Sequence, residues 1–373
     1  MGARIVRVPF GVLMNVARSC NLYCRHCSAE VFRETTELEF SHAEWERVLE
    51  RLASAGVCAV GFTGSEPFIR PWTMALIEKV ARLGFPRIDV QTNGTLLTPE
   101  IASRLAAAKV NRVLTSLDGL RDTHNLIRGW EGAFDATIRG IRMLRSVGLL
   151  TVVQLTAMRP NYDEIESVAQ VVIETGATVF AIRNLVAQGN AARDYQTIAL
   201  DTRQRRELRL RVQALRARLP GLIIRYNTAL FDSITEDGQG GPSGSGGHLM
   251  MCSGAQSTCS ITPDGWLVPC ELLSDFRAGN VRDRDFVEVW NTSPVLAKVR
   301  GAGNSTMKDS KECACCGYTS VCGGGCRGHA YNVYHTLVSP DPDCPLWRRS
   351  ARYMDGCPAP TAGRESGGCV CEP

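Results

Sequence analysis

Three cysteines close together near the N-terminus constrain this chain more than any other feature. Cys20, Cys24 and Cys27 have the spacing CxxxCxxC and follow directly after a first strand candidate. A 4Fe-4S cluster usually has four thiolate ligands, so three on one short loop leave one iron open to a ligand that is not protein. The spacing therefore predicts an iron-sulfur centre with a reactive iron. A zinc site or a set of structural thiols is the alternative interpretation.

Length, charge and cysteine use exclude several classes of protein. A chain of 373 residues has room for a barrel-sized domain and a smaller one. The formal net charge of +4 comes without a clustered basic stripe, so no nucleic-acid partner is expected. The N-terminus has no signal segment, and no apolar stretch approaches membrane-spanning length, so no membrane partner is expected. The 16 cysteines then indicate metal ligands in a reducing cytoplasm and not disulfides.

The first half of the chain repeats a unit of strand, loop and amphipathic helix. The expected strands are 12–16, 57–62, 87–91, 112–116, 151–156 and 178–182. The expected helices between them are 42–53, 72–83, 99–108, 132–147 and 162–175. This alternation predicts an α/β fold, in which a parallel sheet has its helices on the outside.

The cysteine triplet resembles the hallmark of the radical S-adenosylmethionine (SAM) superfamily. In that family the amino and carboxylate groups of SAM chelate the open iron. An injected electron then breaks the sulfonium and gives a 5'-deoxyadenosyl radical. The resemblance implies a partial (β/α)6 barrel of TIM-barrel type, with the chemistry at the C-terminal ends of the strands. It also implies that SAM is a cofactor and that the protein orients the radical against one substrate hydrogen.

The resemblance extends to residues that would contact SAM. Gly64, Ser65 and Glu66 follow the second strand and are similar to the family's GGEP motif, with Ser65 replacing the second glycine. Small residues there would let the backbone approach SAM, and Glu66 would accept a hydrogen bond from its ammonium group. The same branch implies that the SAM carboxylate or ribose is near Asn93, Ser116, Asp118 and Arg128. For each residue alone, a turn or capping role is the alternative.

The C-terminal region is similar to the cysteine-rich SPASM domain found in one branch of the superfamily. Gly265 precedes Cys270 by five positions, and the remaining cysteines of the pattern are Cys252, Cys313, Cys316, Cys322, Cys326 and Cys344, with Cys259 as an eighth thiol. The resemblance implies a first auxiliary cluster on Cys252, Cys259, Cys270 and Cys326. The second would be held by Cys313, Cys316, Cys322 and Cys344. Three 4Fe-4S clusters per chain are therefore expected, with zinc as the alternative for the CxxC pair.

Composition changes divide the chain into four segments. Residues 1–235 are expected to form the barrel and a bridging basic helix at 202–219, and the Gly-rich stretch 236–250 a flexible linker. Residues 251–350 would be the SPASM domain, and the Gly/Pro-rich tail 351–373 is expected to be disordered. Cys58 is expected to be a small core residue. Cys315, Cys357, Cys369 and Cys371 have no assigned role.

The SPASM branch implies an enzyme that oxidises a ribosomal peptide or protein, by crosslinking, decarboxylation or side-chain oxidation. Glu271, next to Cys270, would take a proton from the substrate. The first strand begins within a dozen residues, so a leader peptide would be read by a separate protein or by the enzyme's own surface. The electron donor would be a flavodoxin or ferredoxin. The alternatives are a sulfatase-type maturase and an enzyme of tetrapyrrole, heme or other small-cofactor chemistry, whose members share runs like 185–193.

Overall fold

The computed structural model describes residues 6–29, 38–226, 252–304, 310, 313 and 322–344. The expected linker 236–250 and tail 351–373 lie outside these residues, as do Cys315, Cys316, Cys357, Cys369 and Cys371. The division of the chain into four segments stays a prediction, because the expected boundary falls between the described residues 226 and 252.

Six parallel strands form the centre of the molecule and confirm the expected α/β fold. In chain order they are β1 (Gly11–Asn15), β2 (Ala59–Thr63), β3 (Arg87–Gln91), β4 (Arg112–Ser116), β5 (Thr151–Ala157) and β6 (Val179–Asn184). Each strand pairs in parallel with the next. Their C-terminal ends therefore share one edge of the sheet, and the loops that carry chemistry meet there.

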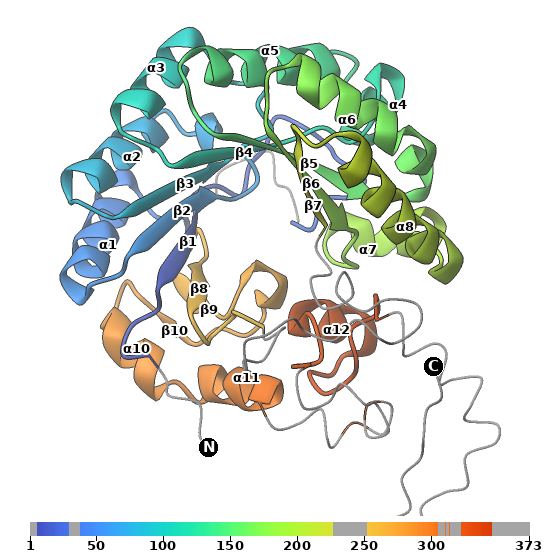
Figure 1. The fold of residues 1–373 in the computed structure, drawn as a ribbon. Helices are drawn as coiled ribbons and strands as arrows, with labels where there is room; N and C mark the ends of the chain where they lie inside the picture. The colour runs from blue at the N-terminus through green and yellow to red at the C-terminus, as the bar shows by residue number, and fades with distance from the viewer. Residues whose placement is uncertain are drawn as a thin grey trace, which may run out of the picture.

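Helices cover the outer face of this sheet, as the amphipathic patterns predict. They are α1 (His42–Ala55), α2 (Thr73–Arg82), α3 (Pro99–Ala107), α5 (Ala133–Ser146) and α6 (Ile165–Glu174). Ser41 begins α1 with a capping box to Glu44, and the side chain of Thr98 caps α3, so local sequence fixes these starts. Trp45, on α1, is fully buried. The helices form an arc around the strands (Figure 1).

Two short strands extend the sheet at both edges and were missed by the sequence analysis. β7 (Ile223–Tyr226) pairs in parallel with β6, and β8 (Thr258–Ile261) pairs in parallel with β1. β9 (Trp266–Val268) and β10 (Gly279–Asn280) continue the β8 edge in antiparallel pairing. The C-terminal region is thus hydrogen-bonded into the same ten-stranded sheet as the barrel.

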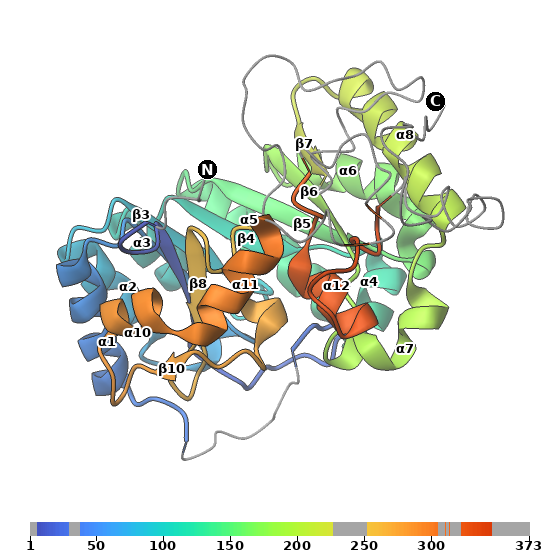
Figure 2. The same cartoon turned by 90° about the horizontal axis from the view of Figure 1, so that it is seen from below.

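The described residues also form three short turns and six further helices. They are the 3₁₀ turns η1 (Pro67–Ile69), η2 (Arg159–Glu164) and η3 (Glu271–Leu273), and the helices α4 (Arg121–Arg128), α7 (Asn190–Ile198), α8 (Thr202–Arg218), α10 (Phe286–Thr292), α11 (Pro294–Asn304) and α12 (Arg327–Tyr334). Figure 2 shows α12 beside α7. No helix among the described residues combines the length and apolar character needed to cross a membrane.

Candidate active site

The three cysteines of the N-terminal triplet lie on the loop after β1, at the C-terminal edge of the sheet. The end of α4 holds this loop through two backbone hydrogen bonds, from Tyr23 N to Arg128 O (3.1 Å) and from Arg25 N to Ile127 O (3.0 Å). Polar groups also reach the sulfurs. Leu22 N donates to Cys20 Sγ (3.4 Å), and Arg128 Nη1 donates to Cys24 Sγ (3.5 Å).

The thiols of the triplet are hard to ionise without a metal. Burial raises the pKa of Cys20 to about 12. Burial and the neighbouring Cys24 raise the pKa of Cys27 to about 11, and burial also raises the pKa of Cys24. Thiols that influence one another in this way form one soft, all-sulfur donor set, which suits iron in a cluster. A bound metal deprotonates its thiol ligands outright, so the residues present fit a 4Fe-4S cluster.

Arg128 connects the cysteine loop to a buried carboxylate. Its Nη2 atom lies 2.5 Å from Oδ2 of Asp118, while the other end of the guanidinium contacts Cys24. His26 Nε2 lies 3.3 Å from the same oxygen. Asp118 is 1% exposed. Burial raises its pKa, but the charge of Arg128, the two neighbouring histidines and a backbone hydrogen bond together outweigh burial and leave the pKa lowered. The pair therefore stays ionised and fixes the loop.

The turn after β2 packs against the same loop and explains the Ser65 departure from the glycine motif. Ser65 Oγ donates to the carbonyl of Arg18 (2.8 Å), so the hydroxyl ties the turn to the segment before Cys20. Gly64 has φ +125, and a Cβ there would lie 2.5 Å from Asn15 Oδ1 and 2.8 Å from Ala17 O. Only glycine fits this approach of two backbones.

Glu66 and Asn93 meet at the edge between β2 and β3. The carboxylate of Glu66 is fully buried and accepts hydrogen bonds from Asn93 N (2.8 Å), Thr92 Oγ1 (2.8 Å) and Phe68 N (3.1 Å). Burial raises the pKa of Glu66 to about 7 against these donors. Asn93 Nδ2 donates to Asn21 Oδ1 (2.9 Å) on the cysteine loop. These hydrogen bonds from the protein therefore hold the Glu66 carboxylate in one orientation.

The structure brings the predicted SAM-contact residues to one edge of the sheet. Ser116 ends β4, and Asp118 lies two residues further along the chain. Gly64, Glu66 and Asn93 follow β2 and β3 at the same edge. These residues lie at the same edge of the sheet as the cysteine loop. Their contacts with SAM stay predictions.

Three of the predicted auxiliary ligands lie together. The charges of Cys252 and Cys326 act on Cys270, whose pKa is raised well above its usual value first by burial and then by these neighbours. A Cβ on Gly254 would lie 3.5 Å from both Cys252 Sγ and Cys270 Cβ, so this glycine leaves room between the two cysteines. This second donor set is again all sulfur.

Cys259, predicted to be the fourth ligand of that set, lies in the hydrophobic core, and its role as a ligand stays a prediction. It is 1% exposed on β8, where it is in register with Val12, and it belongs to the hydrophobic core that contains Ile261 and Trp290. Burial raises its pKa, and the charge that opposes this is that of Arg300. Side chains alternate between the two faces of a strand. The Cys259 side chain is on the same face as that of Val12, which packs into the core beneath the helices.

The second predicted auxiliary set is only partly visible. Cys313, Cys322 and Cys344 are described and half-buried, and Gly324 N donates to Cys322 Sγ (3.3 Å). Cys316 lies outside the described residues. The assignment of this set, and with it the number of clusters, stays a prediction. Cys58, expected in the core, directly precedes β2 and is half-buried.

Glu271 lies between the two sulfur sites. Thr63, the last residue of β2, donates a hydrogen bond from its Oγ1 to Oε1 of Glu271 (3.1 Å). Cys270 directly precedes Glu271 in the chain. Burial raises the pKa of Glu271, and its charge in turn raises the pKa of Cys27. A carboxylate so placed can accept a proton near the C-terminal edge of the sheet, although its role as a base stays a prediction.

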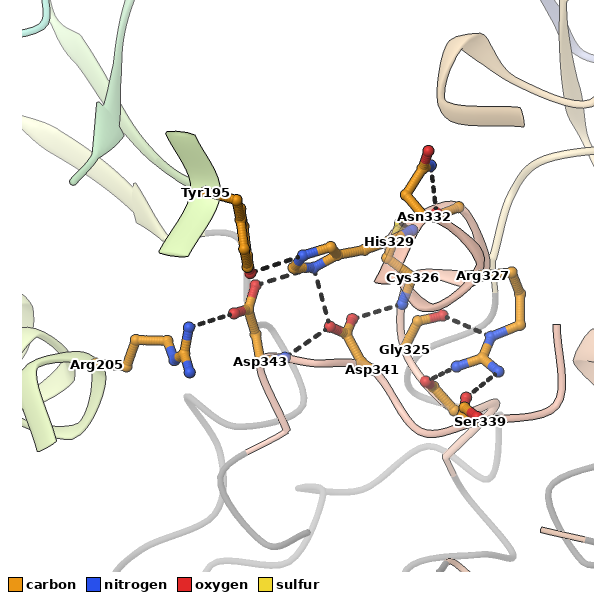
Figure 3. A network of polar contacts seen from close by, with 12 residues as sticks. Tyr195, Arg205, Gly325, Cys326, Arg327, His329, Asn332, Ser339, Asp341 and Asp343 are labelled. Carbon is orange, nitrogen blue, oxygen red and sulfur yellow. Dashed lines mark hydrogen bonds and ion pairs between the residues drawn. The ribbon is translucent and has the colours of Figure 1, made fainter. Parts of the chain in front are cut away.

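A polar network that the sequence analysis did not foresee joins the Cys326 region to the barrel (Figure 3). His329, on α12, lies with Nδ1 3.4 Å from Asp341 and 3.3 Å from Asp343, and its Nε2 is 3.2 Å from the hydroxyl of Tyr195 on α7. Asp341 accepts a hydrogen bond from the backbone N of Cys326 (2.7 Å), and Arg205 on α8 pairs with Asp343 (3.2 Å).

The segment at the start of α7 links the loop of the cysteine triplet to the segment that contains Glu271. Ala191 N donates to Cys27 O (3.1 Å) and Asn190 Nδ2 to Cys24 O (3.3 Å). On the other side, Gln188 Nε2 donates to Glu271 O (3.2 Å). This segment lies in the run 185–193 that the sequence analysis singled out. It therefore fixes the cysteine loop relative to the C-terminal region.

Two family models match the chain. The radical SAM superfamily model covers residues 14–172, and the model of an iron-sulfur cluster-binding domain named SPASM covers residues 252–317. An AdoMet-dependent heme synthase of Nitratidesulfovibrio vulgaris is 31% identical over 89% of this chain and 91% of the relative. The chain belongs to the radical SAM superfamily. It is a radical SAM enzyme with a C-terminal SPASM domain, which confirms the resemblance seen in the sequence.

Other radical SAM enzymes show similar coverage. An Fe-coproporphyrin III synthase of Methanosarcina barkeri is 27% identical over 92% of this chain and 90% of the relative. A PqqA peptide cyclase of Granulibacter bethesdensis is 25% identical over 91% and 88%. The crystal structure of SuiB from Streptococcus suis superposes with a TM-score of 0.74 at 20% identity, over 92% of this chain and 78% of that chain. Family membership implies 4Fe-4S clusters and SAM as cofactors.

Proposed function

We propose that this radical SAM enzyme oxidises a tetrapyrrole. The observation that carries the proposal is the match, along about nine-tenths of both chains, with a heme synthase and an Fe-coproporphyrin III synthase. The run 185–193, which the sequence analysis associated with such relatives, donates hydrogen bonds to backbone carbonyls of the cysteine triplet and of Glu271. This choice reverses the order of the sequence analysis, which placed peptides first.

The chain's own residues divide the work. Cys20, Cys24 and Cys27 would hold the SAM-binding cluster, which supplies the 5'-deoxyadenosyl radical once a donor such as flavodoxin or ferredoxin delivers an electron. Removal of a substrate hydrogen atom leaves a carbon radical, so a two-electron oxidation also requires the loss of one electron and, for a neutral product, one proton. Glu271 is placed to accept the proton. The electron acceptor would be held by Cys252, Cys270 and Cys326.

A peptide substrate is the second candidate. The PqqA peptide cyclase favours it, because this relative matches 91% of the chain. A peptide substrate would have to reach the C-terminal edge of the sheet, with or without a separate leader-binding protein.

The test compares host cells that carry the intact gene with cells that carry Cys24→Ala, by untargeted mass spectrometry of small metabolites and peptides. A porphyrin precursor that accumulates only with Cys24→Ala supports the tetrapyrrole proposal. A short peptide that loses two hydrogens only with the intact enzyme would replace it by the peptide candidate. In purified form, Cys24→Ala is expected to release no 5'-deoxyadenosine from SAM under reducing conditions, and cleavage at the wild-type rate would contradict the assignment of the catalytic cluster.

A further inference from the structure

On the inner face of the sheet, arginines lie next to a small apolar cluster. On β6, Val179 and Ala181 belong to a cluster with Leu114 and Val152, while Phe180 and Ile182 belong to the core beneath the helices. Side chains alternate between the two faces of a strand. Arg183, two residues beyond Ala181, therefore lies on the inner face at the C-terminal end of β6.

Arg225 lies on the same face of the neighbouring strand. On β7, Ile224 and Tyr226 pack into the core beneath the helices, so Arg225 between them points to the inner face. Arg225 is in register with Ala181, which makes it a diagonal neighbour of Arg183. Such neighbours are within reach of one another when both side chains are long. β6 and β7 lie side by side in Figure 1.

The electrostatics show that these positive charges converge. Burial lowers the pKa of Arg183, and the charges of Arg112 and Arg225 lower it further. Arg112, at the start of β4, pairs with Asp89 (2.9 Å). Two guanidinium groups on neighbouring strands can bind one carboxylate through bidentate, charge-assisted hydrogen bonds.

Neighbouring residues connect Arg183 to the loop of the cysteine triplet at the C-terminal edge of the sheet. It is in register with Thr156 of β5, whose backbone N donates to Asp118 Oδ1 (2.9 Å). Asp118 contacts Arg128, which contacts the sulfur of Cys24. An anion at Arg183 and Arg225 would thus lie on the inner face of the barrel, one strand away from the network that holds the cysteine loop.

We propose that Arg183 and Arg225 bind a carboxylate side chain of the substrate and so orient its reacting carbon toward the SAM site. The inference rests on the proposed function, and the substrate class is a tetrapyrrole with carboxylate side chains. It assigns these two arginines a role in specificity, because an uncharged ester of the same ring system would gain nothing from them.

The test measures binding of coproporphyrin III and of its tetramethyl ester to the anaerobic, cluster-loaded enzyme by quenching of porphyrin fluorescence. Arg183→Gln and Arg225→Gln are each expected to weaken coproporphyrin III binding about tenfold or more. Binding of the ester should be equal in wild type and variants. Arg142→Gln is the matched control, since Arg142 is exposed on the outer helix α5, and it should bind as the wild type does. Arg183→Lys should recover part of the loss.

The outcomes separate this inference from the proposed function. Unchanged coproporphyrin III binding by both glutamine variants would overturn the arginine site, while a porphyrin precursor accumulating with Cys24→Ala would still support tetrapyrrole chemistry. A wild-type enzyme that fails to bind coproporphyrin III would contradict both. A loss of SAM affinity in Arg183→Gln, with porphyrin binding intact, would assign Arg183 to the SAM carboxylate and overturn the inference.

Discussion

The charge on His329 offers a quantitative test of how the C-terminal region is held to the barrel. The imidazole is 2% exposed. Burial lowers its pKa, but the hydrogen bonds to Asp341 and Asp343 and the charges of these carboxylates together outweigh burial and raise the pKa from 6.5 to about 9. Each pKa unit corresponds to about 1.4 kcal/mol. The protonated side chain therefore contributes roughly 3 kcal/mol to the free energy of unfolding.

The sign follows from the raised pKa. The contribution is fully present below pH 6.5 and is lost as the pH rises through about 9, because the unfolded chain releases its proton first. The free energy of unfolding of the wild type should fall by roughly 3 kcal/mol across this window from the His329 contribution. His329→Gln should be less stable at pH 6.5 and should lack this component, because glutamine does not balance two carboxylates.

The assay is anaerobic guanidinium unfolding of the cluster-loaded enzyme, followed by tryptophan fluorescence between pH 6.5 and 9.5. His42→Gln is the control: its side chain is 39% exposed on α1, so its curve should parallel that of the wild type. Parallel curves for wild type and His329→Gln would refute the buried imidazolium. The ligand atoms of His329, Asp341 and Asp343 all lie within 4.8 Å of one another. If the free energy of unfolding rises with pH, and the wild type binds one metal ion more than His329→Gln, these three residues hold a cation.

Three further predictions test the two sulfur sites. Cys259→Ala should keep the iron content of the wild type, whereas Cys270→Ala should lose about four irons per chain; equal losses by iron assay would make Cys259 a ligand. Arg128→Met should lower the free energy of unfolding by about 3 to 5 kcal/mol, because it leaves the Asp118 charge buried and unbalanced, and urea curves that match the wild type would contradict this. Gly64→Ala should slow SAM cleavage more than Gly84→Ala, since both have positive φ but only Gly64 has close neighbours; equal 5'-deoxyadenosine yields would remove the steric argument.

The sequence by itself determined the family, the order of the first six strands and of the helices that cover them, and the loops that meet at the C-terminal edge of the sheet. Each of these depends on short-range patterns: alternation of two residues in strands, periodicity of helices, capping residues such as Ser41, and the spacing of Cys20, Cys24 and Cys27. Because parallel strands place their C-terminal ends at one edge, a loop that follows a predicted strand is also placed in space.

Only the tertiary structure decided which distant residues share a site. β7 and β8 are four residues each, too short to give a pattern, yet they extend the six-stranded sheet on both sides. The resemblance to the SPASM domain implies that Cys259 and Cys270 share a cluster, whereas the core position of Cys259 on β8, in register with Val12, is visible only in the structure. The contact of Tyr195 with His329 joins residues that are 134 apart in the chain. Such contacts depend on register and packing between elements, which local sequence does not encode.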